Sequence, residues 1–278
     1  MTASISRRAA AAGLVLAPLP AFANVPPNPA LVKLERDTGA RIGVAASDTG
    51  TFRNLYFRAD ERFVMCSTFK LSLAALVLQR ADAGREMLDR VIHYRWPTLG
   101  VSPATTRNQA TGMSVVDLCE AAVIYSDNTA ANLLLDAVGG PQAVTQFWRS
   151  LGDRYSRLDD NEPELNAPDP ERNTATPAAM LSNLWVLLQG EALKPASRTR
   201  LLGWMHANTT GATTLKAGLP PDWIVGDKTG RNPGPGFIND LAIITPPGRK
   251  PILAAVYSAR SSDAVVAAVG KILASVFA

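Results

Sequence analysis

A serine and a lysine stand three residues apart at the start of an apolar segment, residues 66–80. Because residues with this spacing share one face of a helix, the Lys70 amine would lie near the Ser67 hydroxyl. A serine hydroxyl becomes a good nucleophile when a base takes its proton, and a desolvated lysine with a lowered pKa can help to do so. The same pair is compatible with a serine N-cap and a surface lysine, so covalent catalysis needs support from other segments.

Two further segments carry polar groups that could act on a substrate of such a serine. In the Ser-Asp-Asn sequence that begins at Ser126, the serine could relay a proton and Asn128 could hydrogen-bond a substrate amide. In the Lys-Thr-Gly sequence at the end of an expected strand, Lys228 offers a positive charge and Thr229 a hydroxyl for a substrate carboxylate. Gly230 would let a ligand approach the backbone closely. Each segment by itself is also compatible with an ordinary polar turn.

A proline-rich, acidic stretch, residues 153–173, holds the last pair of candidates. Glu162 could be aimed at a catalytic water, and Asn166 could be the second residue that holds this water. Stretches of this composition usually form solvated surface loops. A catalytic role for Glu162 therefore depends on how the loop is placed against the other segments.

The hydrophobic pattern places these segments between two groups of strands. Strand-like runs occupy residues 41–47, 55–65, 222–230, 238–247 and 251–259. Helical periodicity predicts a first helix over 28–38, a last helix over 263–278, and several helices between the second and third strands. We expect an α+β fold in which both ends of the chain build one five-stranded antiparallel sheet flanked by terminal helices, with an all-helical domain inserted. The expected division is an α/β domain of residues 24–65 and 207–278 and a helical domain of 66–206, with a site in the groove between them.

Composition argues against several other functions. The chain has 278 residues, is 47% hydrophobic and carries a formal charge of +4, with no cluster of Lys and Arg that would indicate a nucleic-acid partner. Two histidines and two cysteines leave little material for a metal site, and we expect neither a metal nor an organic cofactor. After the leader no run of about eighteen apolar residues occurs, so we expect the processed chain to be free of the membrane. We also expect it to be a monomer.

The first residues have the order of a secretory signal peptide. Arg7 and Arg8 precede an apolar run over 9–20, and Ala21-Phe22-Ala23 follows, with a small residue at each end. Cleavage after Ala23 would export the mature chain to the periplasm. The two arginines also permit twin-arginine export, and a disordered N-terminal arm is the alternative to a leader.

The four segments occur together and in this order, and in this combination they resemble the signature of class A serine β-lactamases. Ser-x-x-Lys, Ser-Asp-Asn and Lys-Thr-Gly are shared by these enzymes and the penicillin-binding proteins. Glu162 in the string EPELN separates the two groups, and the strings DNTAANLLL and GDKTG extend the likeness. The resemblance covers essentially the whole mature chain and implies a β-lactamase/transpeptidase-like fold.

The resemblance implies an acyl-enzyme mechanism. Ser67 would attack the lactam carbonyl, and the backbone N–H groups of Ser67 and Arg231 would form the oxyanion hole. Ser126 would pass a proton to the leaving nitrogen. Either Lys70 or Glu162 would take the proton of Ser67, and both assignments stay open.

The same resemblance implies how the ester is hydrolysed and how the substrate is held. Glu162 and Asn166 would hold the hydrolytic water, and Lys228 and Thr229 the substrate carboxylate. Class A enzymes usually add an arginine from behind this strand, but among the matching positions this chain has Thr214 and Asp263. We therefore expect Arg231 to bind the carboxylate, with Arg260 as one alternative, and Asp263 to repel it. The other alternative is that Arg231 points to solvent and that Lys228 and Thr229 suffice.

Two departures from the family pattern lead to expectations about structure. Cys66 and Cys119 stand at positions that form disulfides in relatives, but the partner positions hold Asn232 and Ala74, so we expect two unpaired cysteines. The neck of the Glu162 loop, usually closed by an arginine–aspartate pair, here has Asp160 and Asn173, so we expect a loosely held loop. Arg157 and Asp159 are neighbouring candidates for pinning it.

The sequence thus predicts a hydrolase of penicillin-type β-lactams, with cephalosporins as further candidates, that confers antibiotic resistance. One alternative is a penicillin-binding peptidase acting on cell-wall peptides. Another is a β-lactam sensor that is acylated once and stays acylated. Neither alternative needs the Glu162–Asn166 pair.

Overall fold

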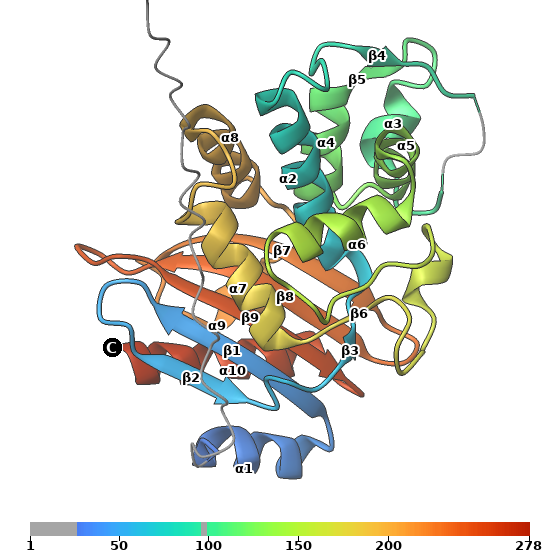
Figure 1. Cartoon of the computed structure of the whole chain (residues 1–278). Helices are drawn as coiled ribbons and strands as arrows, with labels where there is room; N and C mark the ends of the chain where they lie inside the picture. The colour runs from blue at the N-terminus through green and yellow to red at the C-terminus, as the bar shows by residue number, and fades with distance from the viewer. Residues whose placement is uncertain (1–26, 96–98) are drawn as a thin grey trace, which may run out of the picture.

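The structure, a computed structural model, describes residues 27–95 and 99–278 (Figure 1). The predicted leader, residues 1–23, lies outside the described residues. Within those two ranges, no helix has the length and apolar character needed to cross a bilayer.

One five-stranded antiparallel sheet is built from both ends of the chain, as predicted (Figure 1). The strand order is β2-β1-β9-β8-β7, and the strands are β1 (Arg41–Asp48), β2 (Asn54–Phe57), β7 (Ile224–Asn232), β8 (Phe237–Thr245) and β9 (Ile252–Ala259). The predicted second strand is divided. The chain turns at Arg58, which has a positive φ, and then forms the separate short strand β3 (Phe63–Val64), which pairs with β6 (Thr174–Ala175).

The sheet is buried on both faces because helices cover each side. In β9, Leu253, Ala255 and Tyr257 join the core on the side of α7 (Pro177–Leu188), while the alternate residues join a second core with α10 (Asp263–Phe277). Side chains of successive strand residues point to opposite faces, which explains why this strand reads as almost continuously apolar. The helix α1 (Pro29–Thr38) and the short α9 (Leu215–Gly218) pack on α10.

A layer of helices stands beside the sheet and surrounds α2 (Phe69–Asp82) (Figure 1). Every residue of α2 from Phe69 to Leu78 is buried, because the helix packs against others on several sides. Its neighbours are α4 (Val115–Ile124), α5 (Asn128–Val138), α6 (Pro141–Ser150) and α8 (Pro195–His206). The remaining elements at this end are α3 (Pro103–Arg107), β4 (Val91–Ile92) and β5 (Met113–Ser114).

Two helices within residues 66–206 also contact the sheet. The helix α7 packs on β1 and β9, and α8 packs on β7 as well as on α2. The division at residues 65 and 207 stays a prediction.

Candidate active site

The segment that carries Ser67 is fixed by contacts from the sheet. Residues 66–68 form a single 3₁₀ turn between β3 and α2. Inside it, the Thr68 hydroxyl donates to the Met65 carbonyl at 2.7 Å and lies 3.1 Å from the Tyr257 hydroxyl. The strand β7 passes so close that a Cβ at Gly230 would lie 2.6 Å from the Met65 carbonyl oxygen. Glycine at position 230 is therefore required to bring the Lys-Thr-Gly strand against the nucleophile.

Lys70, the second residue of α2, is buried among polar partners. Its Nζ lies 2.9 Å from Oε1 of Glu162 and donates to Oδ1 of Asn128 at 2.5 Å and to the carbonyl of Ser126 at 2.8 Å. The Ser67 hydroxyl donates to the same Glu162 oxygen at 3.2 Å. Three of the predicted segments thus converge on the Glu162 carboxylate and the Lys70 ammonium.

Glu162 is held by its backbone and by its side chain. Asn132 on α5 accepts from the Glu162 N–H and donates to the Glu162 carbonyl, each at 2.9 Å. Asn166 donates to Oε2 of Glu162 at 2.6 Å, and Asn232 on β7 donates to the Asn166 carbonyl at 2.9 Å. The positioning role of Asn132 was missed in the sequence, although this residue lies within the string DNTAANLLL.

Ser126 and Lys228 meet across the site. The Lys228 ammonium donates to the Ser126 hydroxyl at 3.0 Å and to the Thr229 carbonyl at 2.7 Å. The middle residue of Ser-Asp-Asn, Asp127, faces away from them: its carboxylate caps α5 and accepts from the Thr105 hydroxyl of α3 at 2.9 Å. Asp127 therefore anchors the turn on which Ser126 is presented, with Ser126 at a positive φ of 57°.

Burial shifts the protonation equilibria of both lysines. Desolvation lowers the pKa of Lys70, and the Glu162 charge opposes this shift. Burial, together with the nearby Lys70 charge, lowers the pKa of Lys228 to about 7. Behind β7, burial raises the pKa of Asp227 and, more strongly, that of Asp240, which also faces the Asp227 charge. Protons in this site are therefore held less tightly on the amines, and more tightly on these acids, than in water.

Arg231 lies at the end of β7 and is ion-paired. Its guanidinium binds Asp263 through Nη1, and its Nη2 donates to the Thr210 carbonyl at 3.2 Å. The Thr210 hydroxyl lies 2.5 Å from the Thr229 hydroxyl. Thr210 thus contacts both Arg231 and the Thr229 hydroxyl that is predicted to bind the substrate carboxylate. The charge of Asp263 is compensated by its ion pair with Arg231.

The structure therefore gathers the predicted residues around one centre. A connected network joins Ser67, Lys70, Ser126, Asn128, Glu162, Asn166 and Lys228, and its neighbours on β7 are Thr229, Gly230 and Arg231. In the described part of the chain, no group of three His, Cys, Asp or Glu side chains is arranged to hold a metal ion. This arrangement brings together a serine hydroxyl, a carboxylate and an amine that could accept its proton, and a second lysine, Lys228.

Comparison with known proteins decides the family. Residues 28–277 match the model of the beta-lactamase enzyme family. The chain belongs to this family. A β-lactamase of Nocardia asteroides is 47% identical to it over 85% of this chain and 77% of the relative. A carbapenem-hydrolysing β-lactamase of Klebsiella oxytoca is 45% identical over 86% of this chain and 85% of the relative.

Solved structures agree with this assignment. An ancestral class A β-lactamase superposes with a TM-score of 0.86 at 54% identity, covering 89% of this chain and 98% of that protein. The predicted fold and enzyme class are both confirmed: this is a hydrolase of the class A β-lactamase type.

The neck of the Glu162 loop in this β-lactamase is closed by an amide. Oδ1 of Asn173 accepts from the backbone N–H groups of Asp159 and Asp160 at 2.9 and 3.1 Å, and its Nδ2 donates to the Asp160 carboxylate at 2.8 Å. Ion pairs of Arg157 with Asp159 and of Arg172 with Asp160 flank it. The expectation of a loosely held neck is wrong, because the buried Asn173 makes the bonds that an ion pair would otherwise make.

Replacing Asn173 with aspartate should weaken the neck. The new carboxylate would face the Asp160 carboxylate where a hydrogen bond now stands, and the net cost should be about 1–3 kcal/mol of unfolding free energy. Urea unfolding measures this cost, and hydrogen exchange of residues 159–173 should show faster opening. The swap Asp160→Asn with Asn173→Asp recreates an amide–carboxylate pair and should recover part of the loss. Equal stability of Asn173→Asp and the parent would contradict the assignment.

Both cysteines of the β-lactamase are buried and free in the structure, as predicted. Burial raises the pKa of each thiol well above its ordinary value. Buried thiols in this state behave as small apolar side chains.

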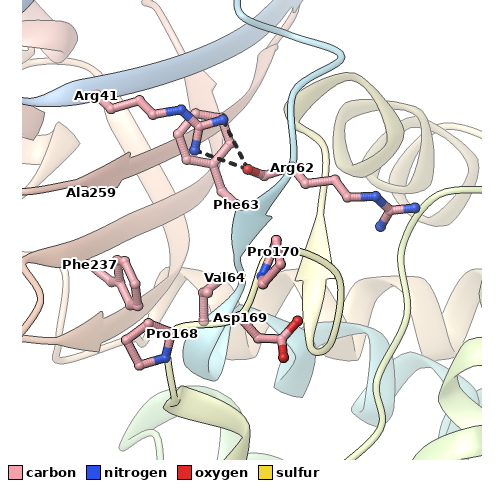
Figure 2. A pocket seen from close by; sticks show the side chains of 9 residues that line it. All are labelled: Arg41, Arg62, Phe63, Val64, Pro168, Asp169, Pro170, Phe237 and Ala259. Carbon is pink, nitrogen blue, oxygen red and sulfur yellow. Dashed lines mark hydrogen bonds between the residues drawn. The ribbon is translucent and has the colours of Figure 1, made fainter.

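A separate cavity of about 300 Å³ lies between β3 and the tip of the loop at Pro168 and Pro170 (Figure 2). Phe237 and Val64 line the cavity. At the edge of the cavity, the Arg41 guanidinium lies over the face of the Phe63 ring. Its lining includes none of the predicted site residues.

Proposed function

We propose that Ser67 opens the lactam ring and that Glu162 returns the acyl-enzyme to free enzyme. The buried arrangement in which the Ser67 hydroxyl donates to a Glu162 carboxylate oxygen, itself paired with Lys70, carries this proposal. In the first step Ser67 Oγ bonds to the lactam carbonyl carbon, the C–N bond breaks, and a proton reaches the leaving nitrogen. In the second step water bonds to the same carbon and the ester C–O bond breaks.

Either of two groups could take the Ser67 proton. Glu162 is in hydrogen-bond contact with the hydroxyl. Lys70 could act as a neutral amine, because burial favours its uncharged form. Ser126, which the Lys228 ammonium contacts, is placed to deliver a proton to the leaving nitrogen. The backbone N–H groups of Ser67 and Arg231 are the proposed donors to the carbonyl oxygen.

Hydrolysis of the ester is assigned to Glu162 and Asn166. A carboxylate can take a proton from water as the water attacks, which is general-base catalysis. The Asn166 amide fixes the Glu162 side chain and would be the second group to hold the water. A sensor that stays acylated, or a peptidase, has no need of this pair, so the pair favours turnover of β-lactams.

The proposed substrates are penicillins and cephalosporins, whose carboxylate would meet Lys228, Thr229 and Arg231. Hydrolysis of these antibiotics confers resistance. Purified protein mixed with a chromogenic cephalosporin should show many turnovers per enzyme. A single stoichiometric burst would indicate a sensor, and cleavage of a cell-wall dipeptide without cephalosporin turnover would indicate a peptidase.

Export and oligomeric state belong to the same proposal. The order of residues 1–23 supports cleavage after Ala23 and export to the periplasm, and we propose that the mature enzyme is a monomer. Cell fractionation with N-terminal sequencing tests the first claim, and light scattering of the purified enzyme tests the second.

The alkaline limb of the pH–activity profile, where activity falls as pH rises, should report the deprotonation of Lys228. Its pKa of about 7 means that the charge is present below this pH and is lost above it. Because kcat/KM reports the free enzyme, kcat/KM for a carboxylate-bearing cephalosporin should fall as pH rises through about 7, far below the ordinary lysine value of 10.5. Arginine stays charged at these pH values, so Lys228→Arg should move the limb upward. An unmoved limb in Lys228→Arg would assign it to another group.

A further inference from the structure

Asp263 and Arg231 form a pair at the carboxylate end of the site. Asp263 stands in the first turn of α10, where the helix N-terminus favours a negative charge, and its second oxygen accepts from the Thr213 hydroxyl. The side chains of Arg231 and Asp263 are 29% and 33% exposed, so solvent and a bound molecule can reach the pair.

The Arg231 side chain is on the same side of β7 as the Thr229 hydroxyl. Residues two apart on a strand share a face, and the contacts agree with this rule. The Thr210 carbonyl accepts a hydrogen bond from the Arg231 guanidinium, and the Thr210 hydroxyl is hydrogen-bonded to the Thr229 hydroxyl. A carboxylate bound at the Thr229 hydroxyl would therefore lie on the same face of β7 as the Arg231 guanidinium, with Thr210 in contact with both residues.

In the structure both Nη groups of the Arg231 guanidinium already have acceptors. Nη1 is taken by the Asp263 carboxylate, and Nη2 by the Thr210 carbonyl and, at 3.4 Å, by the Thr213 hydroxyl. A substrate carboxylate that binds Arg231 through both Nη groups must share or displace these acceptors. Asp263 is the one among them that carries a charge like that of the substrate.

We infer that Asp263 competes with the substrate carboxylate for the Arg231 guanidinium, so that this ion pair sets the preference of the site between anionic and neutral β-lactams. The inference rests on the proposed role of Arg231. Asp263 is then a specificity-determining residue that acts through Arg231, and its removal should strengthen the binding of anionic substrates.

The experiment compares one chromogenic cephalosporin with its methyl ester, which lacks the anionic charge. In Asp263→Asn, KM for the acid should fall about two- to fivefold with kcat nearly unchanged, the scale of a partly exposed ion pair. KM for the ester should stay the same. The gain for the acid should shrink as salt is added, because both charges are partly exposed.

The mode of action is tested in the Arg231→Ala background. There Asp263→Asn should change KM for the acid by less than in the parent, because only direct repulsion remains. An equal gain in both backgrounds would show that Asp263 acts on the substrate directly. A higher KM in Asp263→Asn would show that it only anchors Arg231. Either result, or no change, would overturn the inference.

Two further variants keep the outcomes separable. If Arg231→Ala leaves the acid-to-ester ratio of KM unchanged, the proposed role of Arg231 itself fails. If that ratio rises and Asp263→Asn has no effect, only the competition fails. Asp37→Asn removes one carboxylate from a surface ion pair on α1 and is the matched control for the loss of a charge. Circular dichroism and urea unfolding confirm that each variant is folded.

Discussion

Replacing Glu162 with glutamine should leave a long-lived acyl adduct on Ser67 after mixing with a penicillin. The amide keeps the shape of the side chain but cannot take a proton from water, so deacylation should slow by about 10²–10⁴-fold. Acylation should be affected less, because the Glu162 charge is what opposes the lowered pKa of Lys70. With that charge removed, a larger fraction of Lys70 is the neutral amine that can accept the Ser67 proton.

Mass spectrometry in a time course measures the adduct, and stopped-flow absorbance gives the rate of its formation. Glu164→Gln makes the same change at an exposed position two residues away on the same loop, and this variant should turn over normally. Rapid return of Glu162→Gln to free enzyme would remove Glu162 from deacylation. Failure to form any adduct would instead assign the acylation base to Glu162.

Lys70→Met should abolish most turnover at the acylation step. The methionine fills the space on α2 but offers neither an amine for the Ser67 proton nor donors for Asn128 and the Ser126 carbonyl. We expect kcat/KM to fall about 10²–10⁴-fold with no burst of acyl-enzyme. The variant also leaves the Glu162 carboxylate without its buried partner, which should lower the unfolding free energy by up to about 3–5 kcal/mol.

A second substitution separates the two effects of Lys70→Met. Adding Glu162→Gln removes the orphaned carboxylate, so the double variant should be more stable than Lys70→Met alone while staying inactive. Lys194→Met, at an exposed lysine, controls for the loss of a positive charge. Accumulation of an adduct in Lys70→Met, as in Glu162→Gln, would place Lys70 in deacylation instead.

The spacing of residues along one helix or strand was sufficient to predict which of its polar side chains lie together. Ser67, in the 3₁₀ turn, and Lys70, at the start of α2, both reach Oε1 of Glu162, because a helical path brings residues three apart to one face. The strand pattern also placed Lys228 and Thr229 on β7, although this strand continues to Asn232, two residues beyond the predicted end. The joining of both chain ends in one antiparallel sheet, with helices between, was also predicted from periodicity, whereas the strand order came only from the structure.

The sequence by itself determined the reaction class and the order along the chain of the segments that carry the polar groups. Only the tertiary structure decided how those groups are paired: that Asn132 clamps Glu162, that Asn173 closes the loop neck in place of an ion pair, and that Asp263 holds Arg231. Each of these contacts joins residues at least 13 positions apart in the chain. Their formation depends on how whole elements pack and on which of several nearby acceptors a buried donor meets. The spacing of residues along a helix or strand carries no information about that choice.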